Sequence, residues 1–334
     1  MKSPFTGKEM ILVRENRQMT FRKEEFDFIH HAYRCEETEE QFTTTELDNL
    51  NIFQVYNQYR EKHNIPFPEE IRQIRDKYGV SAAKMSEILG FGANSYRLYE
   101  DGEVPQLSNA RSIQGVKSPS SFKNLVNLCD SLEMKYKQNL IEKIERIEQE
   151  ERKIVTRQNI ESYLFGEPCA SKYTGYKIPN IDKLAAMVFL FASAMKPYKT
   201  KLNKLLFYAD FAMFKNYCQS ISGIRYRAIP MGPVPNNFQS IFEYFQTKGI
   251  INIEYTEFPD GNVAEQYFPV ETYQLDLSIF SEEEFGIIKD VIETFKKDKT
   301  QDIIKKSHDE KPWLNNKEQK SIISYFDGFE LKHI

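Results

Sequence analysis

The chain has 334 residues, of which 40% are hydrophobic and 28% charged, and its formal net charge is −4. This length suggests two or three domains, and the charge excludes a polycation that binds nucleic acid over its whole surface. The polar start MKSPFTGKEM lacks the apolar segment of a signal peptide, and the longest apolar run, at 185–195, is too short to cross a bilayer. Four cysteines without a pairing pattern are typical of a reducing compartment. We therefore expect a cytoplasmic protein with no membrane segment.

Residues 1–66 predict a small β ribbon followed by a helix. Short extended runs, MILVR, MTFRK and FDFIHHAYRC, are separated by polar turns, and Thr44 or Thr45 is suited to cap a helix that ends near Lys62. We expect apolar side chains to hold the ribbon together, and these are Phe5, Leu12, Phe21, Phe26 and Phe28.

The tetrapeptides S-P-F-T and C-E-E-T stand where a zinc ribbon carries its cysteine pairs. In this respect the ribbon resembles a degenerate form of the N-terminal domain of MqsA-like antitoxins. Ser3, Thr6 and Thr38 occupy three of the four ligand places and leave Cys35 alone, and hydroxyl groups are poor zinc ligands beside thiolates. His30 and His31 are neighbours on one strand and point to opposite faces, so they do not complete the set. We expect neither a metal nor another cofactor.

Residues 67–130 predict a compact helical bundle. One apolar helix face ends at Gly79, Ser81 is suited to cap a second helix that closes at Gly90, and ANSYRLYEDG predicts a short third helix that ends at Gly102. The block G-A-N-S-Y-R-L-Y-E-D-G resembles the Xre-type helix-turn-helix, and more closely its MqsA-like branch. Leu98 departs from that pattern, in which an arginine often stands.

The resemblance implies DNA binding, with the third helix in the major groove. Asn94 is the expected base reader, because its amide is able to pair with adenine, and Arg97 would reach a guanine or a phosphate. Ser81, Lys84 and Ser95 would hold the DNA backbone, whereas we expect Tyr96 and Tyr99 to pack inward.

The charge of this bundle keeps a second interpretation open. Between residues 69 and 130 there are eight basic and eight acidic residues, so the sum 8 − 8 is zero. A neutral module gains little from the release of counterions, so one copy alone should bind DNA weakly and two copies would be needed. The alternative is a bundle that no longer binds DNA or that only bridges proteins.

Residues 131–166 predict a long connecting helix, free of Gly and Pro before Gly166. Leu140, Ile144, Ile147 and Ile154 form a heptad-like stripe. Two interpretations remain: the stripe mediates a homodimer, which we favour, or the helix packs on its own domain.

Residues 175–334 predict a domain of helices with a few strands, so that the whole chain is expected to be mainly α, in the α+β sense. A helix apolar on most sides spans 181–195, an apolar ladder continues from Lys201, and a stiff loop, P-M-G-P-V-P, precedes a helix that Asn236 or Asn237 is suited to cap. Strands are expected at IINIEY and around 266–270, joined by a turn at Asp260-Gly261. Helices are expected from a Ser281–Glu284 capping box to Phe295, then at 300–307 and 316–325.

Three ordered blocks in this region, K-L-N-K-L-L-F-Y-A-D, R-Y-R-A-I-P-M-G-P-V-P and S-H-D-E-K-P-W, are similar to the SocA-like antitoxin domain, also called Panacea. The resemblance implies a cognate protein toxin as the partner rather than a substrate. The face expected to hold the toxin is carried over from these blocks and comprises Tyr208, Asp210, Arg225, Tyr226, Pro230, Met231, Gly232, Pro233, His308 and Trp313.

No pattern of residues predicts catalysis. Ser307, His308 and Asp309 are adjacent, so their side chains diverge and do not form a hydrolytic triad, and there is no Gly-rich phosphate loop or H-E-x-x-H motif. We therefore expect a dimeric antitoxin that binds its toxin and represses its own operon by occupying operator DNA. Two alternatives stay open: an adaptor that delivers a toxin to a protease, and a transcriptional regulator whose last domain senses a ligand.

Overall fold

A computed structural model describes residues 1–151, 155–257 and 263–334. The chain is mainly helical with small antiparallel sheets, which confirms the expected fold class. It divides into two compact units, Met1–Arg157 and Gln158–Ile334, and each is described by itself. No helix of the described residues is long and apolar enough to cross a membrane.

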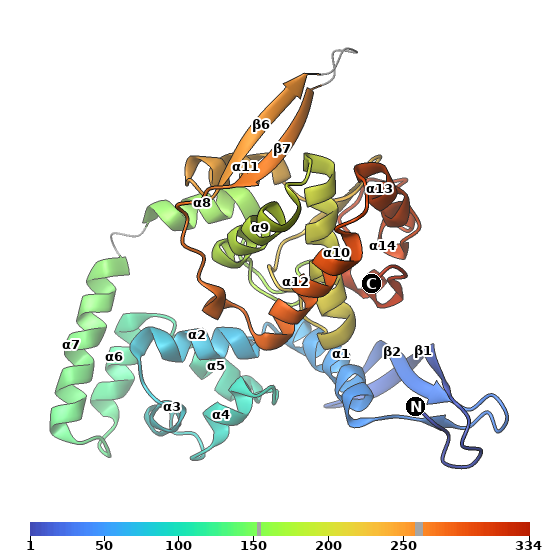
Figure 1. Cartoon of the computed structure of the whole chain (residues 1–334). Helices are drawn as coiled ribbons and strands as arrows, with labels where there is room; N and C mark the ends of the chain where they lie inside the picture. The colour runs from blue at the N-terminus through green and yellow to red at the C-terminus, as the bar shows by residue number, and fades with distance from the viewer. Residues whose placement is uncertain (152–154, 258–262) are drawn as a thin grey trace. The chain divides into compact units, whose positions relative to one another are not determined.

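The first unit begins with a ribbon of two long strands, β1 (Ile11–Phe21) and β2 (Glu24–Arg34), with the short β3 (Gln41–Phe42) at the far edge of β2 (Figure 1). The strands are longer than the three short pieces expected, because a two-residue turn at Arg22 and Lys23, both with positive φ, joins them directly. Phe26 and Phe28 are buried as expected, but Phe5 is exposed. Leu12 is also exposed, so neither of these two side chains holds the ribbon.

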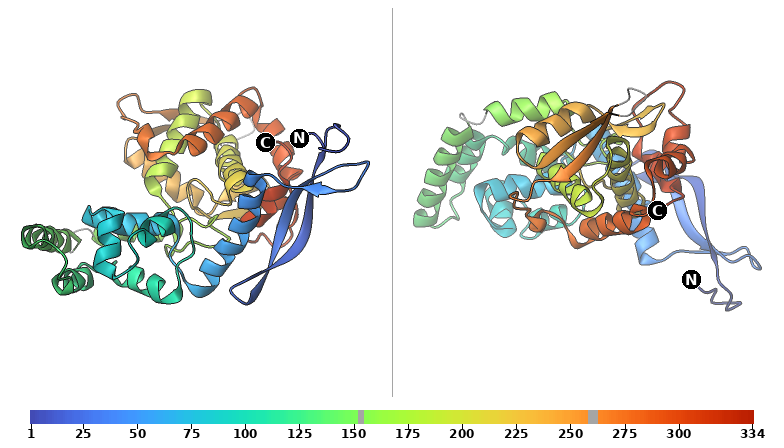
Figure 2. Two further views of the ribbon diagram at one scale, coloured as in Figure 1. Left: turned by 90° about the horizontal axis from the view of Figure 1, so that it is seen from below. Right: turned by 45° about the horizontal axis from the view of Figure 1, so that its top comes forward.

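Helix α1 (Thr45–His63) lies along β2, as two views agree (Figures 1 and 2). Thr44 caps it, as expected, by accepting the backbone N–H of Leu47 at 3.3 Å. The amides of Asn51 and Gln54 replace a missing strand, since each accepts a backbone N–H of β2 and donates to the carbonyl of the same residue. A backbone edge that would otherwise lack partners is thereby satisfied.

Six helices complete the unit: α2 (Pro68–Tyr78), α3 (Ala82–Leu89), α4 (Ser95–Glu100), α5 (Leu107–Gly115), α6 (Pro119–Leu128) and α7 (Met134–Glu151). Gly79 and Gly90 end α2 and α3 in the left-handed conformation that glycine allows. Tyr96 and Tyr99 pack inward as expected.

Helix α7 uses its apolar stripe inside this bundle. Leu140 and Ile144 are buried in the same core as Tyr96, and Ile147 packs against that core. The fourth member of the stripe, Ile154, lies outside the described residues. Of the two interpretations of this stripe, packing on its own domain is therefore the one that the described residues support.

The second unit is built around α10 (Lys199–Tyr217), whose residues from Lys201 to Phe214 are all buried. Around it lie α8 (Val155–Phe165), α9 (Ile181–Met195), α11 (Phe238–Thr247), α12 (Glu282–Phe295), α13 (Thr300–His308), α14 (Lys311–Leu314) and the 3-10 helices η1 (Leu277–Ile279) and η2 (Tyr325–Glu330). Two hairpins, β4 (Tyr226–Ile229) with β5 (Gly232–Pro235) and β6 (Ile251–Glu257) with β7 (Val263–Pro269), complete it.

Several details of this unit differ from expectation. The apolar ladder from Lys201 predicts a helix buried on one face, whereas α10 is buried on all sides. The segment 316–325 contains turns and a β-bridge in place of a helix, and η2 begins only at Tyr325. Asn237 precedes α11 but makes no capping bond, because its own φ is positive and its amide donates to the carbonyl of Leu164. The Ser281–Glu284 capping box is confirmed, and the Asp260-Gly261 turn lies outside the described residues.

Candidate functional site

Three segments that are far apart in sequence meet in the second unit: α10, the β4–β5 hairpin, and the segment from α13 to α14. Lys204 of α10 donates to the carbonyl of Pro233 in the β4–β5 hairpin at 2.9 Å, and the Tyr208 hydroxyl of the same helix donates to Glu310 between α13 and α14 at 3.2 Å. Trp313 of α14 closes the ring by donating its indole N–H to the carbonyl of Ile229 at 2.8 Å. Each segment is hydrogen-bonded to the other two, so the hairpin is held in one position.

Asp210 is the polar centre of this arrangement. It is fully buried and accepts the backbone N–H groups of Ile221 (2.9 Å) and Ser222 (2.8 Å), together with the hydroxyls of Ser222 and Tyr226. Burial raises the pKa of the carboxyl, whereas the four hydrogen bonds favour its ionised form. Burial also raises the pKa of Tyr226, and the nearby Asp210 charge adds to this effect. These groups bond to one another and hold the loop after α10 against the helix.

Lys204 is a second buried polar group. It has no exposed surface, and desolvation lowers its pKa to about 7. Gly232 faces it with a φ of 97°, and a Cβ at this position would lie 2.7 Å from Cε of Lys204 and 2.7 Å from Oγ of Ser307. Glycine is therefore required here both for its backbone conformation and for space.

At the surface, the tip of the hairpin lies beside a stacked pair of rings. Pro230 and Met231 are exposed, the latter to 51%, and the ring of His308 stacks on Trp313 with centroids 4.0 Å apart and planes 13° from parallel. A hydrogen bond ties the His308 ring to the Pro230 backbone, although burial, the largest influence, lowers the pKa of this histidine. We call Pro230, Met231, His308 and Trp313 the hairpin-tip surface.

The remaining residues expected to contact a toxin lie elsewhere. Tyr208, Asp210 and Tyr226 are core residues with no exposed surface, and Gly232 and Pro233 are buried as well. A partner cannot reach these side chains without unfolding the domain, so we leave them out of the proposed surface. Arg225 is partly exposed and donates to the sulfur of Cys169 at 3.3 Å.

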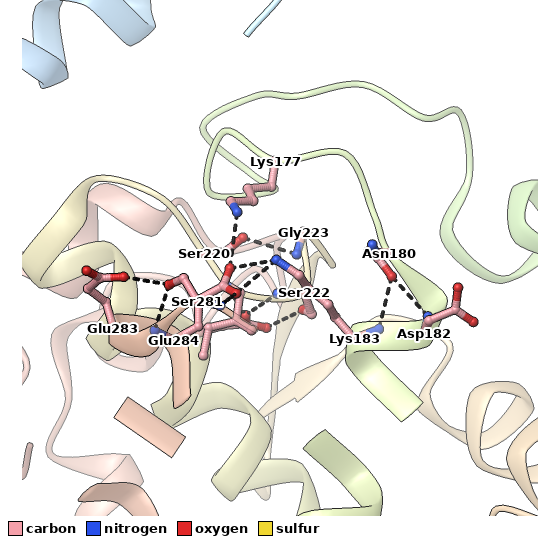
Figure 3. Close-up of polar contacts among 12 residues, drawn as sticks. Lys177, Asn180, Asp182, Lys183, Ser220, Ser222, Gly223, Ser281, Glu283 and Glu284 are labelled. Carbon is pink, nitrogen blue, oxygen red and sulfur yellow. Dashed lines mark hydrogen bonds and ion pairs between the residues drawn. The ribbon is translucent and has the colours of Figure 1, made fainter. Parts of the chain in front are cut away.

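A separate polar cluster joins α9, α12 and the loop before α9 (Figure 3). Glu284, which is 2% exposed, accepts Lys183 at 2.8 Å and Lys177 at 3.1 Å, while its other oxygen accepts the backbone N–H of Ser281. Burial of Glu284 is the largest influence on its pKa and raises it, but the two lysines outweigh burial, so that the pKa is lowered overall. This carboxylate therefore links two lysines and the start of α12 inside the unit.

In the first unit, α4 carries the residues expected to read DNA. Asn94 and Arg97 are exposed, Ser95 is half-buried, and α4 is fixed on α3 by a hydrogen bond from the Tyr96 backbone N–H to Ser86. Asn94 precedes α4 but its amide makes no capping bond there. Arg97 lies 3.8 Å from Asp101, an exposed pair one helical turn apart.

The other two expected DNA contacts have local partners. Ser81 is exposed and caps α3 by accepting the backbone N–H of Lys84. The Lys84 ammonium lies 2.7 Å from Glu87 on the same helix. Both side chains are therefore at the surface, and each would have to exchange its local contact for a phosphate.

At the N-terminus, Ser3, Thr6 and Thr38, which were expected to stand in ligand places of a degenerate zinc ribbon, lie close to Cys35. Thr6 Oγ1 lies 3.6 Å from Cys35 Sγ. Hydrogen bonds from Ser3, Thr38 and Thr6 lower the pKa of the Cys35 thiol to about 6. No group of three or more metal-ligating side chains occurs among the residues that the structure describes.

The second unit is thus a helical domain whose central polar groups bond internally and whose β4–β5 hairpin reaches the surface. The family model described as "Antitoxin SocA-like, Panacea domain" matches residues 202–314, which run from α10 to the end of α14. This region is therefore similar to antitoxin domains, and the match supports an antitoxin role, with a toxin as partner, in general. No curated protein matches the chain.

Several residues that fix the geometry of the candidate sites were not predicted from the sequence. Lys204 and Glu310 fall inside the quoted blocks, where they were not distinguished from the other charged residues. Arg22 and Arg60 lie outside every motif, and only the structure brings them to the segment after α4.

Proposed function

We propose that this chain is an antitoxin that neutralises a cognate protein toxin by direct binding through the hairpin-tip surface. The observation that carries the proposal is the exposed Pro230-Met231 tip, held rigid by the Trp313–Ile229 hydrogen bond and by the His308 ring. A rigid apolar anchor loses little conformational entropy when it is bound, and such anchors dominate the energy of protein interfaces. Binding alone blocks a toxin if the antitoxin binds the toxin more tightly than the competing substrate does, so no catalytic step is needed.

The test is co-expression with the toxin encoded by the neighbouring gene. Met231→Asp places a charge at the tip without touching the core, and we expect it to abolish both rescue of growth and a complex of the purified proteins. Met134→Asp is the matched control, because Met134 is 84% exposed and lies in the other unit. If Met231→Asp rescues growth as the wild type does, the hairpin-tip surface is not the binding site. If the wild type lowers toxin levels only when a protease is present and never inhibits it in vitro, delivery for degradation replaces direct binding.

We further propose that the first unit binds operator DNA through α4 and represses the operon of the antitoxin. Asn94 offers an exposed amide, the group that pairs with adenine in the major groove. Most other basic side chains nearby already face carboxylates: Arg75 faces Glu100, Lys117 faces Glu70 and Lys123 faces Glu145. Few charges remain for phosphates, so one copy would bind weakly, and we propose that a homodimer in the cytoplasm occupies a palindromic operator.

A gel shift on the upstream region tests this second role. Asn94→Ala should weaken operator binding by about 10- to 100-fold, the effect of one lost bidentate base contact. Asn16→Ala removes an exposed amide from the ribbon of the same unit and serves as the control. Equal affinity of the Asn94→Ala variant and the wild type would remove Asn94 as a base reader. No shift with the wild-type protein on any upstream fragment would remove the DNA-binding role itself.

A further inference from the structure

The turn of the ribbon contacts the segment that follows α4. Arg22 lies in the two-residue turn between β1 and β2, with a φ of 49°. Its guanidinium donates to the carbonyls of Val104 at 2.5 Å and Pro105 at 2.8 Å, and it lies over the ring of Tyr59 at 5.3 Å. The ribbon is thereby tied to the chain only a few residues beyond the proposed DNA-reading helix.

A second arginine holds the same segment from α1. Arg60 is only 2% exposed and donates to the carbonyl of Gly102 at 2.5 Å. Its guanidinium also donates to Asn57 at 3.3 Å and lies near the rings of Tyr56 and Phe67. Desolvation lowers the pKa of this arginine to about 10, so it remains charged at neutral pH. Its two terminal nitrogens have these acceptors, whereas its buried Nε has no hydrogen-bond partner among the described residues.

The last residue of α4 is held by α2. The Glu100 carboxylate accepts both Nε and Nη2 of Arg75 on α2, at 2.5 Å and 3.3 Å. The carbonyl groups of Gly102, Val104 and Pro105, which accept Arg60 and Arg22, lie after the end of α4. Carbonyl groups at and after the end of a helix have no partner within the helix, so they are good acceptors for arginine. Gly102, with a φ of 114°, turns the chain between these contacts.

We propose that the ribbon positions α4 for DNA recognition, and that Arg22 is the positioning residue that connects the two. This proposal rests on the proposed DNA-binding role of α4. A base-reading side chain must be held to within about 0.5 Å by the residues behind it. Helix α4 is too short to hold itself, and the Arg22 contacts fix the direction in which the chain leaves it. The ribbon would thus position α4, a role that requires no bound metal.

The experiment uses the full chain with Arg22→Ala, and with Arg22→Lys as the conservative variant. Lys23→Ala is the matched control, since Lys23 is the other residue of the same turn, is exposed as Arg22 is, and also has a positive φ. Affinity for the operator and for unrelated DNA is measured over a series of salt concentrations. Hydrogen exchange of the amides at 95–104 is measured on the free protein.

Arg22→Ala should lower operator affinity by about tenfold or more, because two hydrogen bonds from a charged donor are lost. Affinity for unrelated DNA and the salt slope should not change, and Arg22→Lys should restore part of the operator affinity. In Arg22→Ala, amide exchange at 95–104 should become faster. If instead the salt slope falls by about one for Arg22→Ala, Arg22 contacts a phosphate and the positioning role is overturned. Unchanged operator affinity overturns it too.

The two proposals fail in different ways. If the wild type binds no DNA, the DNA-binding role fails and recognition by α4 fails with it. If the wild type binds its operator but amide exchange at 95–104 is the same in Arg22→Ala, only the positioning role of Arg22 is refuted. A partly unfolded Arg22→Ala variant would show faster exchange throughout the first unit. In that case the same measurements of operator affinity and exchange on Arg22→Lys test the positioning role.

Discussion

The hydroxyl of Tyr226 donates a 2.7 Å hydrogen bond to Oδ2 of Asp210, and neither side chain has any exposed surface. Both residues belong to sequence blocks that suggest a contact face, but their role is to hold the β4–β5 hairpin on α10. The part of that hairpin that is exposed is its tip, Pro230 and Met231, which we propose as the surface for a partner.

Asp210→Ala should destabilise the second unit strongly. The substitution leaves the buried N–H groups of Ile221 and Ser222 without an acceptor, so we expect a loss of at least about 3 kcal/mol in the free energy of unfolding. Asp210→Asn keeps one carbonyl oxygen and should lose less. Trp313 is the only tryptophan of the chain, so urea unfolding followed by its fluorescence reports this unit alone. Equal stability of the Ala and Asn variants would contradict this role for the carboxylate.

Lys204 should make the stability of the second unit increase with pH. Its pKa is about 7 in the folded protein and about 10.5 in the unfolded chain, so between these values the unfolded chain binds more protons. The free energy of unfolding then rises by at most about 1.4 kcal/mol per pH unit, and this dependence disappears below pH 7. Lys204→Met should remove the slope, which is measured by tryptophan fluorescence between about pH 7 and 9. The same slope in both proteins would show that Lys204 does not titrate there.

Ile144→Asp should unfold the first unit rather than separate a dimer. Ile144 has no exposed surface and packs in the core of its own bundle, where an ionised carboxylate is strongly disfavoured. We expect loss of cooperative unfolding in the first unit, followed by circular dichroism, with unchanged tryptophan fluorescence of the second. Met134→Asp, on the exposed side of the same helix, should have no effect on unfolding. A folded but monomeric Ile144→Asp variant would return this stripe to the role of an interface.

The ribbon should become a zinc site when its three hydroxyl residues are replaced. The 3.6 Å between Thr6 Oγ1 and Cys35 Sγ is close to the sulfur–sulfur distance of about 3.8 Å that a tetrahedral site with 2.3 Å bonds requires. The triple variant Ser3→Cys, Thr6→Cys, Thr38→Cys should bind one zinc ion per chain under reducing conditions, measured by metal analysis after gel filtration. Addition of Cys35→Ser should weaken binding. A triple variant without zinc would mean that the four positions do not converge as a ribbon site.

Local patterns in the sequence were sufficient to predict most helices. Thr44, Gly79, Ser81, Gly90 and the Ser281–Glu284 pair mark helix ends correctly, because caps depend on side chains next to the backbone groups that they satisfy. The sequence also placed Tyr96 and Tyr99 inside the bundle, and its three ordered blocks suggested the family that residues 202–314 match.

Only the tertiary structure decided which of those residues reach the surface. Tyr208, Asp210 and Tyr226 are polar and belong to the same set of blocks as Met231, yet they are buried because distant donors and acceptors satisfy them. In the same way the α7 stripe is used by its own bundle, and Arg22 reaches the carbonyls after α4 from 82 residues away. Periodicity and capping are properties of a few neighbouring residues, whereas burial and long-range hydrogen bonds depend on how segments meet, which no local pattern contains.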